Sequence, residues 1–234
     1  MKHEHHSHHK MNYKLPSVYV NAVYRSDRIL IQVRDAKDMT VELLKDHEKS
    51  LHLIIVSADL ETFLHVHPIE TISGDFEVKV NLPSGRYFLF ADISPIKGIY
   101  VIEPVLLMVG EETESIANDF SKLVKSDRPT KEIQGKTVTF QHPKLTAGEP
   151  ATLSFDLNGE SPLLYLGALG HVVVLDEQGK RFIHVHPSSK DHPIFQVRFP
   201  SAGFYKLWAE FHFADTGVLA FPFIVEVTDQ GSLR

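Results

Sequence analysis

Two sets of three histidines have the same spacing in this chain, and each member of the second set follows its counterpart by 119 residues. The first triad is His52, His65 and His67, and the second triad is His171, His184 and His186. Each triad ends in the motif His-Val-His-Pro. Neutral imidazole is a ligand for Zn(II), Cu(II), Ni(II) and Fe(II). Three histidines repeated in register therefore predict a metal site in each copy of a duplicated unit.

Four other side chains are candidates to complete or orient these sites. Asp92 and Glu210 occupy matching positions in the two copies, and each could bind the metal or hold a ligating imidazole in place. His212 lies two residues beyond Glu210, on the same face of an expected strand. His47 precedes the first triad, but Leu166 occupies its position in the second copy, so His47 is not part of the shared motif.

The N-terminus offers a separate set of metal ligands. This tract contains His3, His5, His6, His8 and His9. Such a density of histidine is typical of a metal-binding tract. The imidazole of the third residue, the terminal amine and two backbone amides could also form a square-planar Cu(II) or Ni(II) site. An interrupted expression tag is the alternative interpretation.

The composition narrows both the metal and the class of protein. Cys is absent, which excludes disulfides, thiolate metal sites and blue-copper centres. The four Met residues do not cluster, so they do not supply the sulfur ligands that Cu(I) prefers. We therefore expect a divalent transition metal, copper or zinc, as the cofactor. The net charge of −6 indicates no basic surface for nucleic acid.

The first triad is expected on a β-hairpin. Segments 51–57 and 63–67 have the composition of strands, with a turn between them. A turn centred near residues 59–60 places His52 opposite His67, with His65 two residues along on the same face. Opposed β-carbons lie about 5 Å apart and diagonal ones about 7–8 Å. Three imidazoles at these separations could bind one metal ion.

The second triad predicts the same geometry, with a turn over 176–179 and His171 across from His186. Ile54 and Val56 should share the face of the first triad. This apolar surrounding is compatible with a buried metal site. It is equally compatible with a polar network in which the histidines only form hydrogen bonds.

The whole chain has the pattern of an all-β protein. Short segments rich in Val, Ile, Phe and Tyr alternate with turn residues about every ten positions. We predict two tandem antiparallel β-sandwich domains, immunoglobulin-like or cupredoxin-like, joined by a short helix. Strands at 29–33 and 137–140 are expected to open the two domains. The predicted divisions are a disordered histidine-rich tail at 1–12, a first repeat at 13–110, a helical linker at 111–129 and a second repeat at 130–234.

The linker should contain a helix over residues 113–125. Its apolar positions fall on one helical face and are Ile116, Phe120, Leu123 and Val124. Thr113 or Ser115 could cap its start, and Pro129 should end it. We expect this helix to pack on one or both sandwiches, and a solvated connector is the alternative.

No apolar run of about 18 residues occurs, so the sequence predicts no membrane span. The first ten residues also lack the apolar core of a secretory signal. The sequence as it stands therefore predicts a cytoplasmic protein. Removal of a leader during processing would instead predict an extracytoplasmic one.

Segments 47–68 and 165–187 resemble an uncharacterised bacterial β-sandwich domain related to YtkA-like and FixH-like proteins. The resemblance covers roughly residues 28–110 and 136–228. Proteins with this domain are often secreted or membrane-anchored and are found near copper-handling components. The resemblance implies sandwich domains, and it implies metal handling by both triads.

The leading hypothesis is a non-catalytic module that binds, buffers or delivers a divalent metal, with each sandwich holding one site or both sharing one at their interface. A metal transporter or metal chaperone would be its protein partner. The first alternative is a structural or protein-interaction β-sandwich with hydrogen-bonding histidines.

The second alternative is a metal-dependent, cupin-like oxygenase, because His65 and His67 are followed by Glu70. That carboxylate comes too early for the cupin pattern, and Ser189 occupies its position in the second copy. The later cupin histidine is also missing, with Phe88 near its place. Enzyme activity therefore has weak support, and no catalytic residue is assigned.

Overall fold

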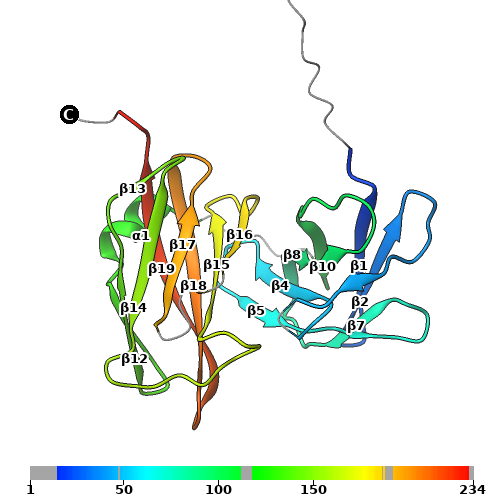
Figure 1. Cartoon of the computed structure of the whole chain (residues 1–234), viewed down its shortest axis with the longest axis horizontal. Helices are drawn as coiled ribbons and strands as arrows, with labels where there is room; N and C mark the ends of the chain where they lie inside the picture. Colours follow the sequence, from blue (N-terminus) through cyan, green and yellow to red (C-terminus); the bar gives the residue numbers. More distant parts are fainter. Residues whose placement is uncertain (1–14, 47, 112–117, 186, 188–191, 232–234) are drawn as a thin grey trace, which may run out of the picture.

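The computed structural model describes residues 15–46, 48–111, 118–185, 187 and 192–231. Within them the chain forms two β-sandwiches side by side, the first in blue to green and the second in green to red (Figure 1). The predicted all-β fold, with two repeated antiparallel sandwiches and a short helix between them, is confirmed. Among the described residues, no helix has the length and apolar character needed to cross a membrane.

The first sandwich has sheet orders β1-β2-β7-β6 and β10-β8-β4-β5, with a small β3-β9 ribbon. Its strands are β1 Val18–Arg25, β2 Arg28–Asp35, β3 Leu43–Leu44, β4 His52–Ser57, β5 Phe63–Val66, β6 Ile69–Glu70, β7 Phe76–Lys79, β8 Gly85–Asp92, β9 Ser94–Pro95 and β10 Val105–Val109. Strand β2 alternates between inward and outward residues, and its inward Ile29, Ile31 and Val33 are fully buried in the sandwich core.

The second sandwich repeats this arrangement with sheet orders β11-β12-β14-β17 and β13-β19-β18-β15-β16. Its strands are β11 Thr130–Ile133, β12 Lys136–Gln141, β13 Leu145–Thr146, β14 Pro150–Asp156, β15 His171–Asp176, β16 Phe182–Val185, β17 Ile194–Arg198, β18 Gly203–Phe213 and β19 Gly217–Thr228. All pairings are antiparallel except β13 with β19, which is parallel.

The prediction that 29–33 and 137–140 open the two domains is wrong, because β1 and β11 precede them. Both are edge strands that pair with only one neighbour. Most residues of β1 and all of β11 are partly or fully exposed, so neither has a continuous apolar face for the sequence to reveal.

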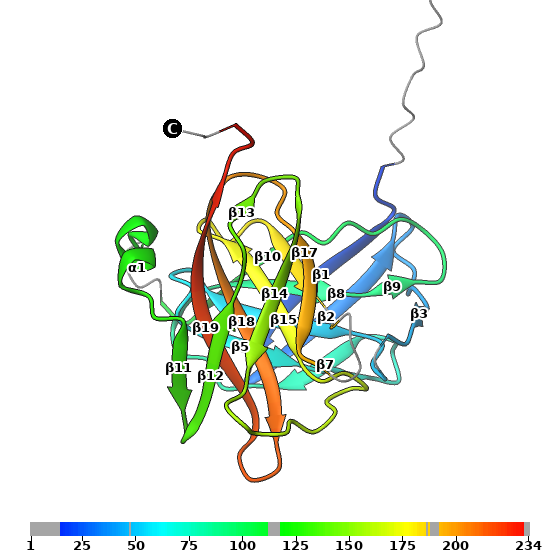
Figure 2. The same cartoon turned by 60° about the vertical axis from the view of Figure 1, so that its left-hand side comes forward.

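Helix α1, Phe120–Ser126, is shorter than predicted and follows Asp119 at its N-cap position. The predicted caps Thr113 and Ser115, like Ile116, lie outside the described residues. Figure 2 shows α1 at one side of the second sandwich, where it contacts β18 and β19. Its Phe120 is buried, which agrees with a helix packed on a sandwich and not with a solvated connector.

The two sandwiches pack against each other through the sheets that contain β4 and β15 (Figure 1). In β4, Leu53 and Ile55 point into their own sandwich, whereas Ile54 and Val56 point into the interface. Both faces of β4 are thus buried, which explains why its apolar run is continuous. The buried residues of this interface cluster are Ile54, Val56, Leu60, Phe90, Phe120, Val173, Leu175 and Trp208.

Two aromatic stacks close the interface and are related by the sequence repeat. Phe63 stacks on Trp208 with ring centroids 4.8 Å apart, and Phe90 stacks on Phe182 at 4.9 Å. Both pairs have an interplanar angle of 11°. Each stack joins one ring from each repeat, so the two domains meet with approximate twofold symmetry.

Candidate metal centre at the domain interface

The hairpin that carries the first triad has the predicted register. Leu53 pairs with Val66 and Ile54 pairs with His65, so continuing the ladder by one residue brings His52 opposite His67. All three histidines therefore share one face, which is the face that meets the second sandwich and not the interior of the first. The second hairpin has the matching register, with Val172 paired to Val185.

The ring nitrogens of the first triad converge. Nδ1 of His52 lies 3.2 Å from Nε2 of His65 and 3.2 Å from Nε2 of His67. One nitrogen from each ring lies within 4.8 Å of the other two. Ligand atoms about 2.0–2.1 Å from a tetrahedral zinc ion lie about 3.3–3.4 Å apart. The two 3.2 Å separations are therefore close to those that a single bound ion requires.

Hydrogen bonds on the far sides of the rings fix which nitrogen faces the centre. Nε2–H of His52 donates to the backbone carbonyl of Asp46 at 3.0 Å, so Nδ1 of His52 carries the lone pair. Nδ1 of His65 lies 2.6 Å from Oε2 of Glu210, a residue of the second repeat. A carboxyl group behind an imidazole orients the ring and increases its basicity toward a metal.

Burial keeps these groups neutral. It lowers the pKa of His65 to about 2, and the neighbouring charges of His184 and His52 act in the same direction. Burial likewise lowers the pKa of His67 to about 3 and lowers the pKa of His52. Neutral imidazole is the form that binds metals, and these three rings are neutral at neutral pH.

Burial also raises the pKa of Glu210 to about 8. In the metal-free protein at neutral pH, its carboxyl therefore keeps a proton and donates it to Nδ1 of His65. Nε2–H of His65 then donates to Nδ1 of His52, whose Nε2–H donates to Asp46. In the metal-free protein, His65 and His52 thus belong to a continuous hydrogen-bonded chain from Glu210 to Asp46.

The second triad uses the same hydrogen bonds. Nε2–H of His171 donates to the backbone carbonyl of Tyr165 at 3.0 Å. Nδ1 of His184 lies 2.7 Å from Oδ2 of Asp92, a residue of the first repeat. The opposite nitrogens, Nδ1 of His171 and Nε2 of His184, are fully buried. His186 lies outside the described residues.

The two triads adjoin across the domain interface. The ring centroids of His65 and His184 are 5.4 Å apart, and those of His65 and His171 are 5.8 Å apart. The rings of His52 and His184 are separated by 5.9 Å. We refer to the five described rings, those of His52, His65, His67, His171 and His184, as the histidine cluster.

The remaining candidates divide into three groups. Asp92 and Glu210 each contact Nδ1 of a triad histidine. This position suits the predicted role of holding a ligating imidazole in place. His212 is near the cluster only through Tyr165, whose ring centroid is 6.0 Å away, and no described contact joins His212 to a triad ring. His47 and the N-terminal histidines His3, His5, His6, His8 and His9 lie outside the described residues.

Sequence reasoning missed the carbonyl groups of Asp46 and Tyr165. Each belongs to a tight turn closed by two backbone hydrogen bonds, between Asp46 and Lys49 and between Tyr165 and Ala168. The second turn has positive φ angles at Leu166 and Gly167, as a two-residue hairpin loop requires. The available signal was positional, since Tyr165 follows Asp46 by the same 119 residues that separate the triads.

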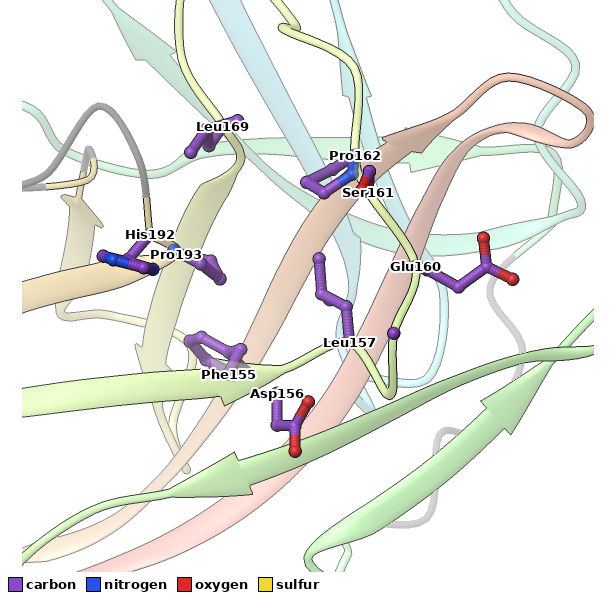
Figure 3. Close-up of a pocket in the computed structure, with 10 residues that line it drawn as sticks. Phe155, Asp156, Leu157, Glu160, Ser161, Pro162, Leu169, His192 and Pro193 are labelled. Carbon is purple, nitrogen blue, oxygen red and sulfur yellow. The ribbon is translucent and has the colours of Figure 1, made fainter.

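A hollow of about 500 Å³ lies at one end of the second sandwich (Figure 3). Its walls include Phe155, Leu157 and Pro162, with the exposed His192 at its rim. No described triad histidine lines it. His192 and His142 are exposed, and neither has a histidine counterpart in the first repeat.

Several solved structures are distantly similar to the chain. The chain is 15% identical to CopC from Methylosinus trichosporium OB3b, with a TM-score of 0.28, over 38% of this chain and 85% of that one. It is 12% identical to the chicken interferon gamma receptor alpha chain, with a TM-score of 0.28, over 92% of this chain and 100% of that one. It is 10% identical to the FN1–FN3 domains of chicken CNTN1, with a TM-score of 0.25, over 91% of this chain and 65% of that one. Sequence identities and TM-scores this low do not support an inference about function.

No curated protein matches the chain. A family model described as a domain of unknown function, DUF8832, matches residues 11–109 and again residues 131–229. The two matches contain the two triads and account for most of the chain. The chain therefore belongs to the DUF8832 family, of which it carries two tandem copies.

Proposed function

We propose that this protein binds a divalent transition metal, copper or zinc, and that it buffers or delivers the ion without catalysing a reaction. The observation that carries the proposal is the convergence of three neutral imidazoles. Nδ1 of His52 lies 3.2 Å from Nε2 of both His65 and His67. The cluster contains donors that suit Zn(II) and Cu(II), and it lacks the sulfur that Cu(I) prefers.

The site has the features of a binding site more than of a catalytic one. The ring of His52 is 3% exposed and the side chain of His65 is fully covered, so little room is left beside an ion for a substrate. The carboxylate of the cupin-like alternative, Glu70, is exposed in β6. It is not among the described groups that could hold a metal with the first triad.

The structural alternative is favoured by one observation, which is that the metal-free hydrogen-bond chain is complete from Glu210 to Asp46. The triads would then only hold the two domains together through hydrogen bonds. The two functions differ in their response to metal. Only a metal-binding protein gains stability from an ion, because a ligand that binds only the folded state raises its free energy of unfolding.

The relation to YtkA-like and FixH-like proteins, and a metal transporter or chaperone as partner, belong to the same proposal. So does a cytoplasmic location, with an extracytoplasmic one as the alternative. The domain division predicted from the sequence, with repeats at 13–110 and 130–234, is part of it as well.

Equilibrium dialysis with metal analysis tests the proposal. The parent protein is the full chain in which the five N-terminal histidines are replaced by alanine, so that the tail cannot bind the metal. We expect Cu(II) or Zn(II) to bind this parent and to raise its melting temperature, with reversal by a chelator. His67→Ala should weaken binding, whereas the exposed matched control His142→Ala should not. Equal binding by both variants would contradict the assignment.

A further inference from the structure

We propose that the first triad and the pair His171 and His184 form one dinuclear centre, in which this pair holds a second divalent ion beside the ion of the first triad. This inference rests on the proposed function and adds to it a second ion, its ligands and the coupling between the two. It concerns the domain interface as a whole and not one repeat.

The first step is that His171 and His184 are held in the same way as their counterparts His52 and His65. In the first triad, Nδ1 of His52 and Nε2 of His65 face each other. In the second, Nδ1 of His171 and Nε2 of His184 are the fully buried nitrogens. The opposite nitrogens of all four rings are held in the same two ways, by a backbone carbonyl and by a carboxyl group. Water can fill the open coordination positions of a second ion.

The second step is that the two sets of ligands are neighbours. His65 and His184 lie edge to face, with ring centroids 5.4 Å apart and an interplanar angle of 87°. His171 is 5.7 Å from His184 on one side and 5.8 Å from His65 on the other. Two ions bound to these rings would therefore be neighbours, with the contacting rings of His65 and His184 between them.

The third step is that the strands cross-connect the two triads. The backbone of Glu210 in β18 pairs with His171 of the second triad, while its side chain holds His65 of the first. The backbone of Asp92 in β8 pairs with His52, while its side chain holds His184. Fixing one triad by an ion therefore fixes a carboxyl group that orients the other triad. We expect the second ion to bind with positive cooperativity for this reason.

Charge is compatible with two ions. Two divalent cations repel each other strongly in a buried site. Asp92 and Glu210 lie directly behind the ligating rings and can offset part of this positive charge when ionised. The imidazoles of the first triad are neutral and add no further repulsion, because burial lowers their pKa values.

The test uses Cu(II) and the full chain with its five N-terminal histidines replaced by alanine. Copper bound per chain is measured by dialysis, and electron paramagnetic resonance reports whether bound Cu(II) ions interact. We expect two ions per chain, a sigmoidal binding curve and spectra broadened by the neighbouring ion. His184→Ala should reduce the count to one ion and remove the broadening. His184→Gln serves the same purpose if the alanine variant does not fold, and His142→Ala is the matched control.

The outcomes separate the two proposals. One ion per chain that is unaffected by His184→Ala but lost in His67→Ala would overturn the dinuclear centre and leave the proposed function standing. Two ions with no magnetic interaction would also overturn the dinuclear centre, because the sites would then be far apart. Absence of any bound copper or zinc would defeat both proposals.

Discussion

The carboxyl group of Glu210, in the second repeat, lies 2.6 Å from Nδ1 of His65 in the first repeat, although 145 residues separate them. The mirrored pair, Asp92 of the first repeat and His184 of the second, is 2.7 Å apart. Each repeat thus supplies the acid that orients a histidine of the other. The candidate metal centre and the domain interface are therefore a single structure.

Replacing the acid should weaken metal binding without removing a ligand. Glu210→Gln keeps the size of the side chain but loses the carboxylate that holds His65. Changes to such orienting groups typically cost about 10–100-fold in metal affinity. We expect this range for Cu(II) or Zn(II) in isothermal titration calorimetry of the tail-substituted full chain.

The control for this prediction is Glu77→Gln. Glu77 pairs with Arg28 on the surface of the first sandwich, away from the cluster. An affinity unchanged in Glu210→Gln, or lowered equally in Glu77→Gln, would show that the carboxyl group has no specific role at the site.

The free energy of unfolding of the metal-free protein should be greatest near pH 6.5. The pKa of His65 is about 2 in the folded state, below its ordinary value of 6.5, so the unfolded chain binds the extra proton in acid and stability falls below about pH 6.5. The pKa of Glu210 is about 8, above its ordinary 4.5, so stability also falls as the pH rises from about 4.5 to about 8. Each fully shifted group contributes a slope of about 1.4 kcal/mol per pH unit.

Between about pH 4.5 and 6.5 the slopes of His65 and Glu210 oppose each other, and the lowered pKa values of His52 and His67 tip the balance toward acid destabilisation. Urea unfolding at about pH 5, 6.5 and 8 measures this profile. Glu210→Gln should flatten the profile between pH 6.5 and 8 and steepen the fall from pH 6.5 to 5, because it removes the slope that opposes that of His65. A stability that rises steadily from pH 6.5 to 8 in the parent would contradict the assignment of a buried neutral carboxyl.

Trp208 provides a built-in reporter, because it is the single tryptophan of the chain. It is 3% exposed in the interface cluster and lies two residues before Glu210 in β18. Cu(II) quenches nearby indole fluorescence, so we expect copper to quench the emission of Trp208 in a saturable way. In the tail-substituted chain, His65→Ala combined with His184→Ala should abolish the effect. Quenching that persists in this double variant would place the copper outside the histidine cluster.

The aromatic stacks should contribute to the stability of the whole molecule. Phe63 packs face to face on the buried Trp208. Replacing a buried aromatic residue by alanine typically costs about 3–5 kcal/mol. We expect the lower end of that range for Phe63→Ala, which is only partly buried, in chemical unfolding. We also expect weaker metal binding, since the two repeats must stay docked to form the centre. Leu106→Ala, at an exposed site in β10, is the control.

The hairpin of each triad could be predicted from the sequence because its register depends on local spacing and on a repeat. Leu53 and Val66 pair where the turn geometry places them. The way in which the domains dock could not be predicted, because both faces of β4 are equally apolar in the sequence. Whether Ile54 points into a sandwich core or into an interface depends on a partner more than 100 residues away in sequence, such as Val173.

The same limit applies to the site itself. Asp92 and Glu210 were expected beside the triads because they match in the two copies, yet the exchange of partners between repeats depends on how the domains pack. Edge strand β1 escaped prediction because few of its residues are buried. Asp46 and Tyr165 act through backbone carbonyls, for which residue type gives no signal.

The most direct test of the central claim is a crystal structure of the full chain grown with Cu(II) or Zn(II), with anomalous scattering recorded at the absorption edge of the metal. The account predicts an anomalous peak about 2.0–2.1 Å from Nδ1 of His52 and from Nε2 of His65 and His67. A structure with metal in the crystal, no peak among these rings, and Nδ1 of His52 still 3.2 Å from Nε2 of both His65 and His67 would contradict it.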